Sequence, residues 1–170
     1  IVNSQDFLCK KLTREGDGYI INSYLPRLEE MKLKISLLQN PFYLKSISPD
    51  FIEPNITLRN EFKCKVKIEN DLSLNSFLKG ILFESIPSCY LEGYESLMKK
   101  MKSFGFPKNP KFIFTSNNFF SDEIFKIWAA EKVENRTPYY IGQHGNNYGV
   151  HRFISYETLE ETTSDRFLTW

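Results

Sequence analysis

A strand, a helix and a second strand follow one another within about thirty residues near the carboxyl end of the chain, an order that constrains the fold more than any other feature. Residues 112–115 form a short apolar run that predicts a buried strand. Residues 121–133, with Ser121 as a cap and two acidic residues in the first turn, predict a helix. Residues 138–141 predict the next strand and residues 167–170 a third. Strands joined by a crossover helix run parallel, so the sequence predicts an α/β fold with a parallel sheet and flanking helices.

Three amphipathic helices are predicted before this unit. Apolar residues recur every three or four positions over residues 25–38, 72–84 and 88–104. For the third helix, Ser88 is the expected N-cap and Gly105 the expected residue just past the end. We expect the second and third helices to pack together through their apolar stripes.

The remaining early segments lack helical spacing. Residues 40–62 contain three prolines and several Asn and Ser, which predicts an irregular connection. Basic and apolar residues alternate over residues 63–68, which predicts a strand with one solvated face. We therefore expect an irregular and helical part, residues 1–62, and an α/β domain, residues 63–170, truncated at its carboxyl end. Because Trp170 lies inside a strand-like run, we interpret the chain as a fragment that is inactive by itself.

Charge and cysteine content exclude several classes of protein. The 22 basic and 21 acidic residues nearly cancel, so the chain has no overall attraction to nucleic acid or anionic lipid. The three cysteines are widely spaced and form no metal-binding motif, which favours a reducing compartment over a disulfide framework. The sequence has neither a membrane-spanning apolar stretch nor a secretory leader. We expect a cytoplasmic protein.

Two polar loops follow the predicted strands, where ligands of parallel sheets bind. The first contains Ser116 and Asn117, and the second runs from Gln143 to Gly149 around His144. Its glycines let the backbone approach a ligand, its amides suit sugar hydroxyls, and the imidazole suits a general base. The plainer alternative is that His144 hydrogen-bonds its own loop. His151, the second of the two histidines, is interpreted as a surface residue.

Other enzyme signatures are missing from the sequence. It contains no nucleophile elbow, zincin motif, phosphate-binding P-loop or dinucleotide fingerprint. It also contains no Asp-x-Asp motif for a metal-bound nucleotide. Asp165 precedes the last predicted strand beside Arg166, where a cap or local ion pair is as good an interpretation as a contact to substrate.

Six short motifs lie at residues 1–6, 87–94, 112–117, 125–132, 141–149 and 164–170. Together they resemble the transferase family found in bacterial O-antigen biosynthesis regions. Where that family tends to have Gly-Gly-Asn in the second polar loop, this chain has Gly145-Asn-Asn147. The matching motifs are dense over the last sixty or so residues and sparse before residue 87.

The resemblance implies a fold and a reaction. The implied fold is GT-B, a two-lobed architecture of Rossmann-like domains whose C-terminal lobe holds a nucleotide-activated donor; that lobe would lie outside this chain. The Gln-His-Gly triplet at residues 143–145 is also similar to the His-Gly segment of teichoic-acid glycerophosphotransferases, where the histidine is a catalytic base. The resemblance thus implies a glycosyltransferase of surface-polysaccharide synthesis without cofactor or metal, whose substrates are a nucleotide sugar and a glycan or lipid-linked acceptor. It also allows peripheral association with the inner membrane through parts outside this chain, and sets no oligomeric state.

Within this hypothesis each polar side chain has a role. His144 takes a proton from the acceptor hydroxyl. The residues expected to contact substrate or shape the loop are Gln143, Gly145, Asn146, Asn147, Tyr148, Ser116, Asn117 and Asp165. Two alternatives stay open: a non-catalytic domain that binds a sugar or nucleotide or scaffolds a partner, and a transferase of glycerol phosphate.

Overall fold

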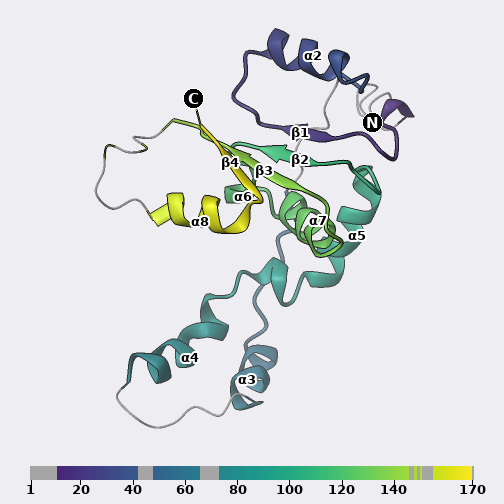
Figure 1. Ribbon diagram of the computed structural model, residues 1–170. Helices are drawn as coiled ribbons and strands as arrows, with labels where there is room; N and C mark the ends of the chain where they lie inside the picture. The colour runs from purple at the N-terminus through teal and green to yellow at the C-terminus, as the bar shows by residue number, and fades with distance from the viewer. Residues whose placement is uncertain are drawn as a thin grey trace. The chain divides into compact units, whose positions relative to one another are not determined.

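The computed structural model describes residues 11–41, 48–65, 73–145, 148, 150 and 155–169, with side chains undescribed for 155–158 (Figure 1). The chain divides into two compact units. The first combines Ile1–Ser48 with Met101–Trp170, and the second is Pro49–Lys100. The second unit is thus inserted in the sequence of the first.

A parallel sheet of four strands forms the centre of the first unit. The strands are β1 (Tyr19–Ile21), β2 (Ile113–Thr115), β3 (Tyr139–Gly142) and β4 (Arg166–Leu168). They lie in chain order, each parallel to the next. The predicted α/β class, the βαβ unit and the third strand are therefore confirmed. The two-lobed GT-B arrangement stays a prediction.

Strand β1 is an addition to the predicted sheet. Its partner β2 follows about ninety residues later, and three residues are too few to show strand periodicity. Gly18 fits directly before it because a Cβ there would lie 2.3 Å from the Phe112 ring. The division into residues 1–62 and 63–170 stays a prediction; in the structure, a strand of the first range pairs with the sheet of the second.

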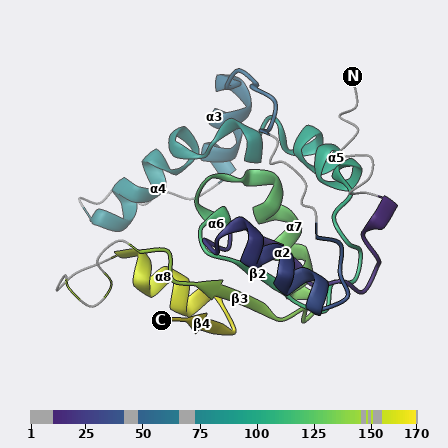
Figure 2. The same cartoon turned by 90° about the horizontal axis from the view of Figure 1, so that it is seen from above.

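Helices cover both faces of the sheet in the first unit. Figures 1 and 2 show α2 on one side of the sheet and α7 and α8 on the other. The predicted helices at 25–38 and 121–133 are confirmed as α2 and α7, with a separate short turn, α6, before α7. The cap of α7 is Asp122, not Ser121, because Asp122 Oδ1 accepts a 2.9 Å hydrogen bond from the Phe125 amide. The bounds are Arg27–Ser36 for α2, Asn118–Ser121 for α6, Glu123–Glu134 for α7 and Ser155–Thr163 for α8.

Aromatic side chains fill the space between the sheet and α7. Trp128 stacks on Phe106 with 4.5 Å between ring centroids and meets Tyr19 of β1 edge-on at 4.8 Å. Phe125 is fully buried beside them. Such ring pairs each contribute about 0.5–1.5 kcal/mol beyond their buried area. This cluster fixes α7, and with it the start of the loop that precedes β3.

The second unit contains α3 (Ile56–Lys65), α4 (Leu74–Ser85), a 3₁₀ turn at Ser88–Tyr90 and most of α5 (Tyr94–Phe104). The irregular connection predicted for residues 40–62 is wrong from Ile56 onward, and the strand predicted at 63–68 is wrong at 63–65. Asn55 accepts from the Leu58 amide and starts the helix. Residues 66–68 lie outside the described residues.

A buried ion pair explains why α3 forms there. Arg59 Nε and Nη2 donate to the two carboxylate oxygens of Glu92 at 2.7 and 2.9 Å. Its remaining donors reach the carbonyls of Phe83, Glu84 and Ile86 at the end of α4. The hydrogen bonds from Arg59 lower the pKa of Glu92 to about 2. This tertiary contact outweighs the alternating pattern seen in the sequence.

The two helices predicted for residues 72–84 and 88–104 have mixed outcomes. Helix α4 is confirmed, with Ser73 as its cap, but four residues of its apolar stripe are exposed, so the predicted packing of the two stripes is wrong. The third helix begins only at Tyr94, because Ser88 opens the 3₁₀ turn instead of capping an α-helix. Gly105 has φ +96°, which confirms it as the residue after the helix. No helix in the described part of the chain is long and apolar enough to cross a membrane.

Candidate functional site

Polar loops from three strands gather at the carboxyl edge of the sheet. One follows β1 at Asn22, one follows β2 at Ser116, and one follows β3 at Gln143. Parallel register puts these loops at the same edge. Ser116 N–H donates to the Asn22 carbonyl at 3.0 Å and so joins the first two loops, whereas Gln143 N–H donates to the carbonyl of Leu168 in β4 at 2.8 Å.

A buried carboxylate holds the imidazole of the third loop. His144 Nε2 lies 3.0 Å from Oε1 of Glu160, which is on α8. The Tyr148 hydroxyl donates to the other oxygen, Oε2, at 2.5 Å. The side chain of Glu160 is fully buried, and that of His144 is 10% exposed. The structure thus contains a His–carboxylate pair in a nearly dry environment, an arrangement that strengthens hydrogen bonds to charged groups.

Aromatic rings enclose His144. The Tyr148 and Phe120 rings meet the imidazole edge-on, with centroids 5.4 and 5.7 Å away. The Tyr24 ring, from the loop after β1, lies 6.0 Å away. These rings limit the rotation of the imidazole.

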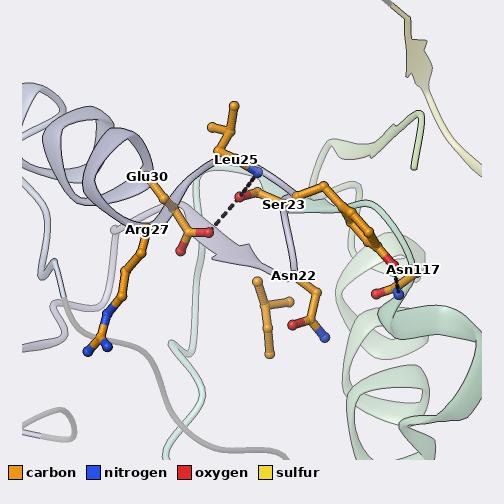
Figure 3. Close-up of a pocket in the computed structure, with 8 residues that line it drawn as sticks. Asn22, Ser23, Leu25, Arg27, Glu30 and Asn117 are labelled. Atoms are coloured by element: carbon orange, nitrogen blue, oxygen red, sulfur yellow. Dashed lines mark hydrogen bonds between the residues drawn. The ribbon is translucent and has the colours of Figure 1, made fainter. Parts of the chain in front are cut away.

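A pocket of about 360 Å³ opens beside Tyr24 (Figure 3). In Figure 3, Arg27 and Glu30 extend from α2 on one side and Asn117 lies on the other. Asn117 donates its side-chain amide to the Tyr24 hydroxyl at 2.8 Å. Tyr24 therefore belongs both to the pocket and to the surroundings of His144. The pocket is lined by Ile21, Asn22, Ser23, Tyr24, Leu25, Arg27, Glu30 and Asn117.

The two charged side chains that line this pocket, Glu30 and Arg27, differ in their ion pairs. Glu30 forms a buried ion pair with Lys34 at 2.6 Å and accepts from the Ser23 hydroxyl at 2.5 Å. Arg27 is exposed, and none of the described residues forms an ion pair with it. The pocket thus presents one available cation and several amide and hydroxyl groups, which suits a polyhydroxylated or anionic ligand.

Hydrogen bonds hold the loop after β1 in an unusual conformation. Asn22 and Tyr24 have φ of +47° and +59°, a region that side-chain-bearing residues seldom occupy. The Asn22 amide donates to Asn118, whose own amide donates to Asp122 at 3.0 Å. Because Asp122 also caps α7, the loop is fixed to the start of that helix. Such strained positions cluster at functional sites.

The structure brings most of the predicted site residues together. Gln143, His144, Gly145 and Tyr148 belong to the loop after β3, where Gly145 has φ +84° and open space around it. Asn146 and Asn147 lie outside the described residues. Glu160 and three aromatic rings surround His144, whose side chain is 10% exposed.

The predicted residues outside this loop have different surroundings. Asn117 lines the pocket, whereas Ser116 is fully buried and donates its hydroxyl to the Ser23 carbonyl at 3.2 Å. Asp165 is not near the others. It joins the amino ends of β3 and β4, where its backbone N–H donates to the Tyr139 carbonyl and its carboxylate accepts from the Tyr139 amide.

Four residues of the site were not predicted: Glu160, Tyr24, Asn22 and Arg27. A strand at residues 19–21 would have made Asn22 and Tyr24 candidates, since they follow its carboxyl end. Glu160 could not be recognised from the sequence. A hydrophobic pattern predicts that Leu159 is buried and Glu160 exposed, but in the structure Glu160 is buried and Leu159 is half exposed. Among the described residues, no three His, Cys, Asp or Glu side chains are placed to hold a metal ion.

Comparison with known proteins identifies a family. A family model described as "LIC12162 family transferase" matches residues 2–170 of the chain. No curated protein and no solved structure matches the chain significantly. The match covers both compact units, including every described residue of the carboxyl-edge site.

Proposed function

The chain belongs to the LIC12162 family of transferases, and on that premise we propose that it serves glycosyl transfer from a nucleotide-activated sugar in the synthesis of a bacterial surface polysaccharide. The proposal rests on the position of His144 at the carboxyl end of β3. Its imidazole is hydrogen-bonded to Glu160 and lies beside Tyr24, which lines a polar pocket. The proposed site lies wholly within the first compact unit.

The proposed step moves one proton and exchanges one bond. The acceptor hydroxyl oxygen attacks the anomeric carbon of the donor sugar, and its proton passes to His144. The bond between the anomeric carbon and the phosphate oxygen breaks, and the nucleoside phosphate leaves with the electron pair. A positioned general base of this kind contributes roughly 10²–10⁴-fold to the rate.

The pocket beside Tyr24 is the proposed acceptor site. The amides of Asn22 and Asn117 and the hydroxyl of Ser23 are groups that bind sugar hydroxyls, and the Tyr24 ring offers an apolar face. Arg27 favours an acceptor with a negative group such as a phosphate or carboxylate. Gln143, Gly145, Asn146 and Asn147 are proposed to border the reacting atoms, with the donor held mainly by a further lobe of a GT-B architecture. We place the reaction in the cytoplasm, without metal or cofactor.

The test is product formation by the full-length protein with a panel of activated donors. Nucleotide sugars and an activated glycerol phosphate form the two arms, each offered with polyhydroxylated acceptors. We expect a glycosylated acceptor and a released nucleotide with at least one sugar donor, and loss of that product in His144→Ala. Product only from the glycerol phosphate donor would replace glycosyl transfer by the related phosphotransfer. Tight sugar binding without any turnover would indicate a binding domain.

A further inference from the structure

Glu160 is the most completely buried ionisable side chain of the described structure near the proposed site. It is fully buried, and its two carboxylate oxygens accept from two different residues, His144 and Tyr148. Burying a carboxylate costs several kcal/mol unless donors compensate it. Helix α8 buries this carboxylate and leaves the adjacent Leu159 half exposed. This orientation of the helix lowers the stability of the fold. That cost needs a reason other than packing.

The carboxylate determines which ring nitrogen of His144 carries hydrogen. An ionised carboxylate only accepts hydrogen bonds, so Nε2, at 3.0 Å from Oε1, is the protonated nitrogen of the neutral ring. This tautomer is assigned from the hydrogen-bond partners. In this tautomer Nδ1 is the ring nitrogen that carries no hydrogen, so it is the basic nitrogen of the ring.

Tyr148 fixes the carboxylate in turn. Its hydroxyl donates to Oε2 at 2.5 Å, a distance typical of an O–H group bound to a charged oxygen. The Tyr148 ring also packs against Phe167 of β4, with centroids 5.6 Å apart. Loop, helix and strand thus all restrain the position of Glu160.

We propose that Glu160 is the positioning residue of this site: it holds His144 in the Nε2–H tautomer, so that Nδ1 receives the proton of the acceptor hydroxyl, and it stabilises the imidazolium that results. The inference rests on the proposed function for the identity of the proton donor. Three tyrosines of the described structure interact with this pair: Tyr24, Tyr148 and, from β3, Tyr139. Burial, and after it the charge of Glu160, raises the pKa of Tyr139 well above its usual value, as a nearby anion does.

The tautomer can be measured on the chain itself. With two histidines in the sequence, long-range ¹H–¹⁵N spectra of the imidazoles contain two sets of signals, and His151→Ala assigns them. At a pH where His144 is neutral, we expect the wild-type ring in the Nε2–H form. In Glu160→Gln we expect a mixture of both tautomers, because the new amide can donate as well as accept. The matched control is Glu161→Gln, which changes the exposed neighbour and leaves the wild-type pattern.

Kinetics of the full-length enzyme separate positioning from structure. We expect Glu160→Gln to lower kcat roughly 10²–10⁴-fold with little change in the KM for the acceptor, because a ring in the wrong tautomer cannot take the proton. Tyr148→Phe removes one donor to Glu160 but leaves the pair intact, so it should keep the Nε2–H form and lose less activity.

Three outcomes would overturn the inference. The first is a wild-type His144 in the Nδ1–H form, which needs no variant to detect. The second is a Glu160→Gln chain that keeps the pure Nε2–H tautomer. The third is full turnover by a folded Glu160→Gln enzyme. If the tautomer depends on Glu160 but His144→Ala turns over normally, the hydrogen-bond geometry stands and the proposed base role of His144 fails, so the two failures are distinguishable.

Discussion

The side-chain amide of Asn117 donates a 2.8 Å hydrogen bond to the hydroxyl of Tyr24, which joins the loop after β2 to the loop after β1. The two loops are 93 residues apart in sequence. Both residues line the pocket, and the Tyr24 ring also lies beside His144. One hydroxyl therefore connects the proposed acceptor site with the proposed base.

Removing that hydroxyl should weaken acceptor binding. In Tyr24→Phe the ring beside His144 is kept, but the Asn117 amide loses its acceptor, so we expect KM for the acceptor to rise roughly 5- to 10-fold, the equivalent of one neutral hydrogen bond. The change in kcat should be smaller. Steady-state kinetics of the full-length enzyme measure both. Tyr94→Phe, at a half-exposed position in the second unit, is the control; an unchanged KM in Tyr24→Phe would argue against the pocket as the acceptor site.

Replacing His144 should affect both rate and stability. We expect His144→Ala to lower kcat roughly 10²–10⁴-fold. It also leaves the buried Glu160 with one donor fewer, which should cost about 1–3 kcal/mol of unfolding free energy. Kinetics and urea unfolding on the same preparation check the two effects. His151→Ala should turn over at nearly the wild-type rate, and a His144→Ala enzyme with wild-type kcat would rule out the base role.

Acid should destabilise the second unit through Glu92. Its pKa is lowered from 4.5 to about 2 by the hydrogen bonds from Arg59, so its contribution to stability is complete above pH 4.5 and is lost as the pH falls toward 2. We expect Glu92→Gln to be less stable than wild type at neutral pH. Between pH 6 and 2, urea unfolding should then show a smaller loss of unfolding free energy in Glu92→Gln than in wild type. Glu95→Gln, an exposed change close by, should follow the wild-type curve. Parallel curves for wild type and Glu92→Gln would contradict the assignment.

Two Gly→Ala changes should have opposite signs. At Gly142, the last residue of β3, an added Cβ would lie 2.7 Å from the Phe114 ring and 2.8 Å from Ser116 Oγ, so we expect a loss of about 1–3 kcal/mol. At Gly80, inside α4, an added Cβ would have no atom within 4 Å beyond the adjacent residues and the backbone of its own helix, and Ala should stabilise by about 0.4–1 kcal/mol. Thermal melts of both variants provide the measurement. A neutral Gly142→Ala would mean that Phe114 and Ser116 give way freely.

The sequence predicted those elements whose signal is local. The βαβ unit was recognisable because apolar runs, a polar first turn and a short crossover follow one another directly in residues 112–141. Helix α3 and strand β1 were not, since α3 depends on Arg59 meeting Glu92, and β1 on pairing with distant β2. In both cases a tertiary contact between remote residues overrides the local pattern.

The same distinction between local signals and tertiary contacts applies to the candidate site. His144 and Tyr148 were recognised from their loop, because residue type and glycine spacing are visible in sequence. Their partner Glu160 lies on another element, and only the fold shows that α8 turns this carboxylate inward. Asp165 shows the converse: its polar character is visible, but the strand order puts it at the amino edge of the sheet.

The insertion of Pro49–Lys100 between β1 and β2 has a consequence for the order of folding. Closing the connection from β1 to β2 involves a loop roughly four times as long as that from β2 to β3, which costs about 1.2 kcal/mol more in chain entropy. Strands β2, β3 and β4 can therefore associate first, and β1 should join last, after the inserted residues have become compact. In hydrogen exchange, the amides of β1 should lose protection before those of β3. The loop that carries Tyr24, and hence the acceptor pocket, would then form only in the final stage of folding.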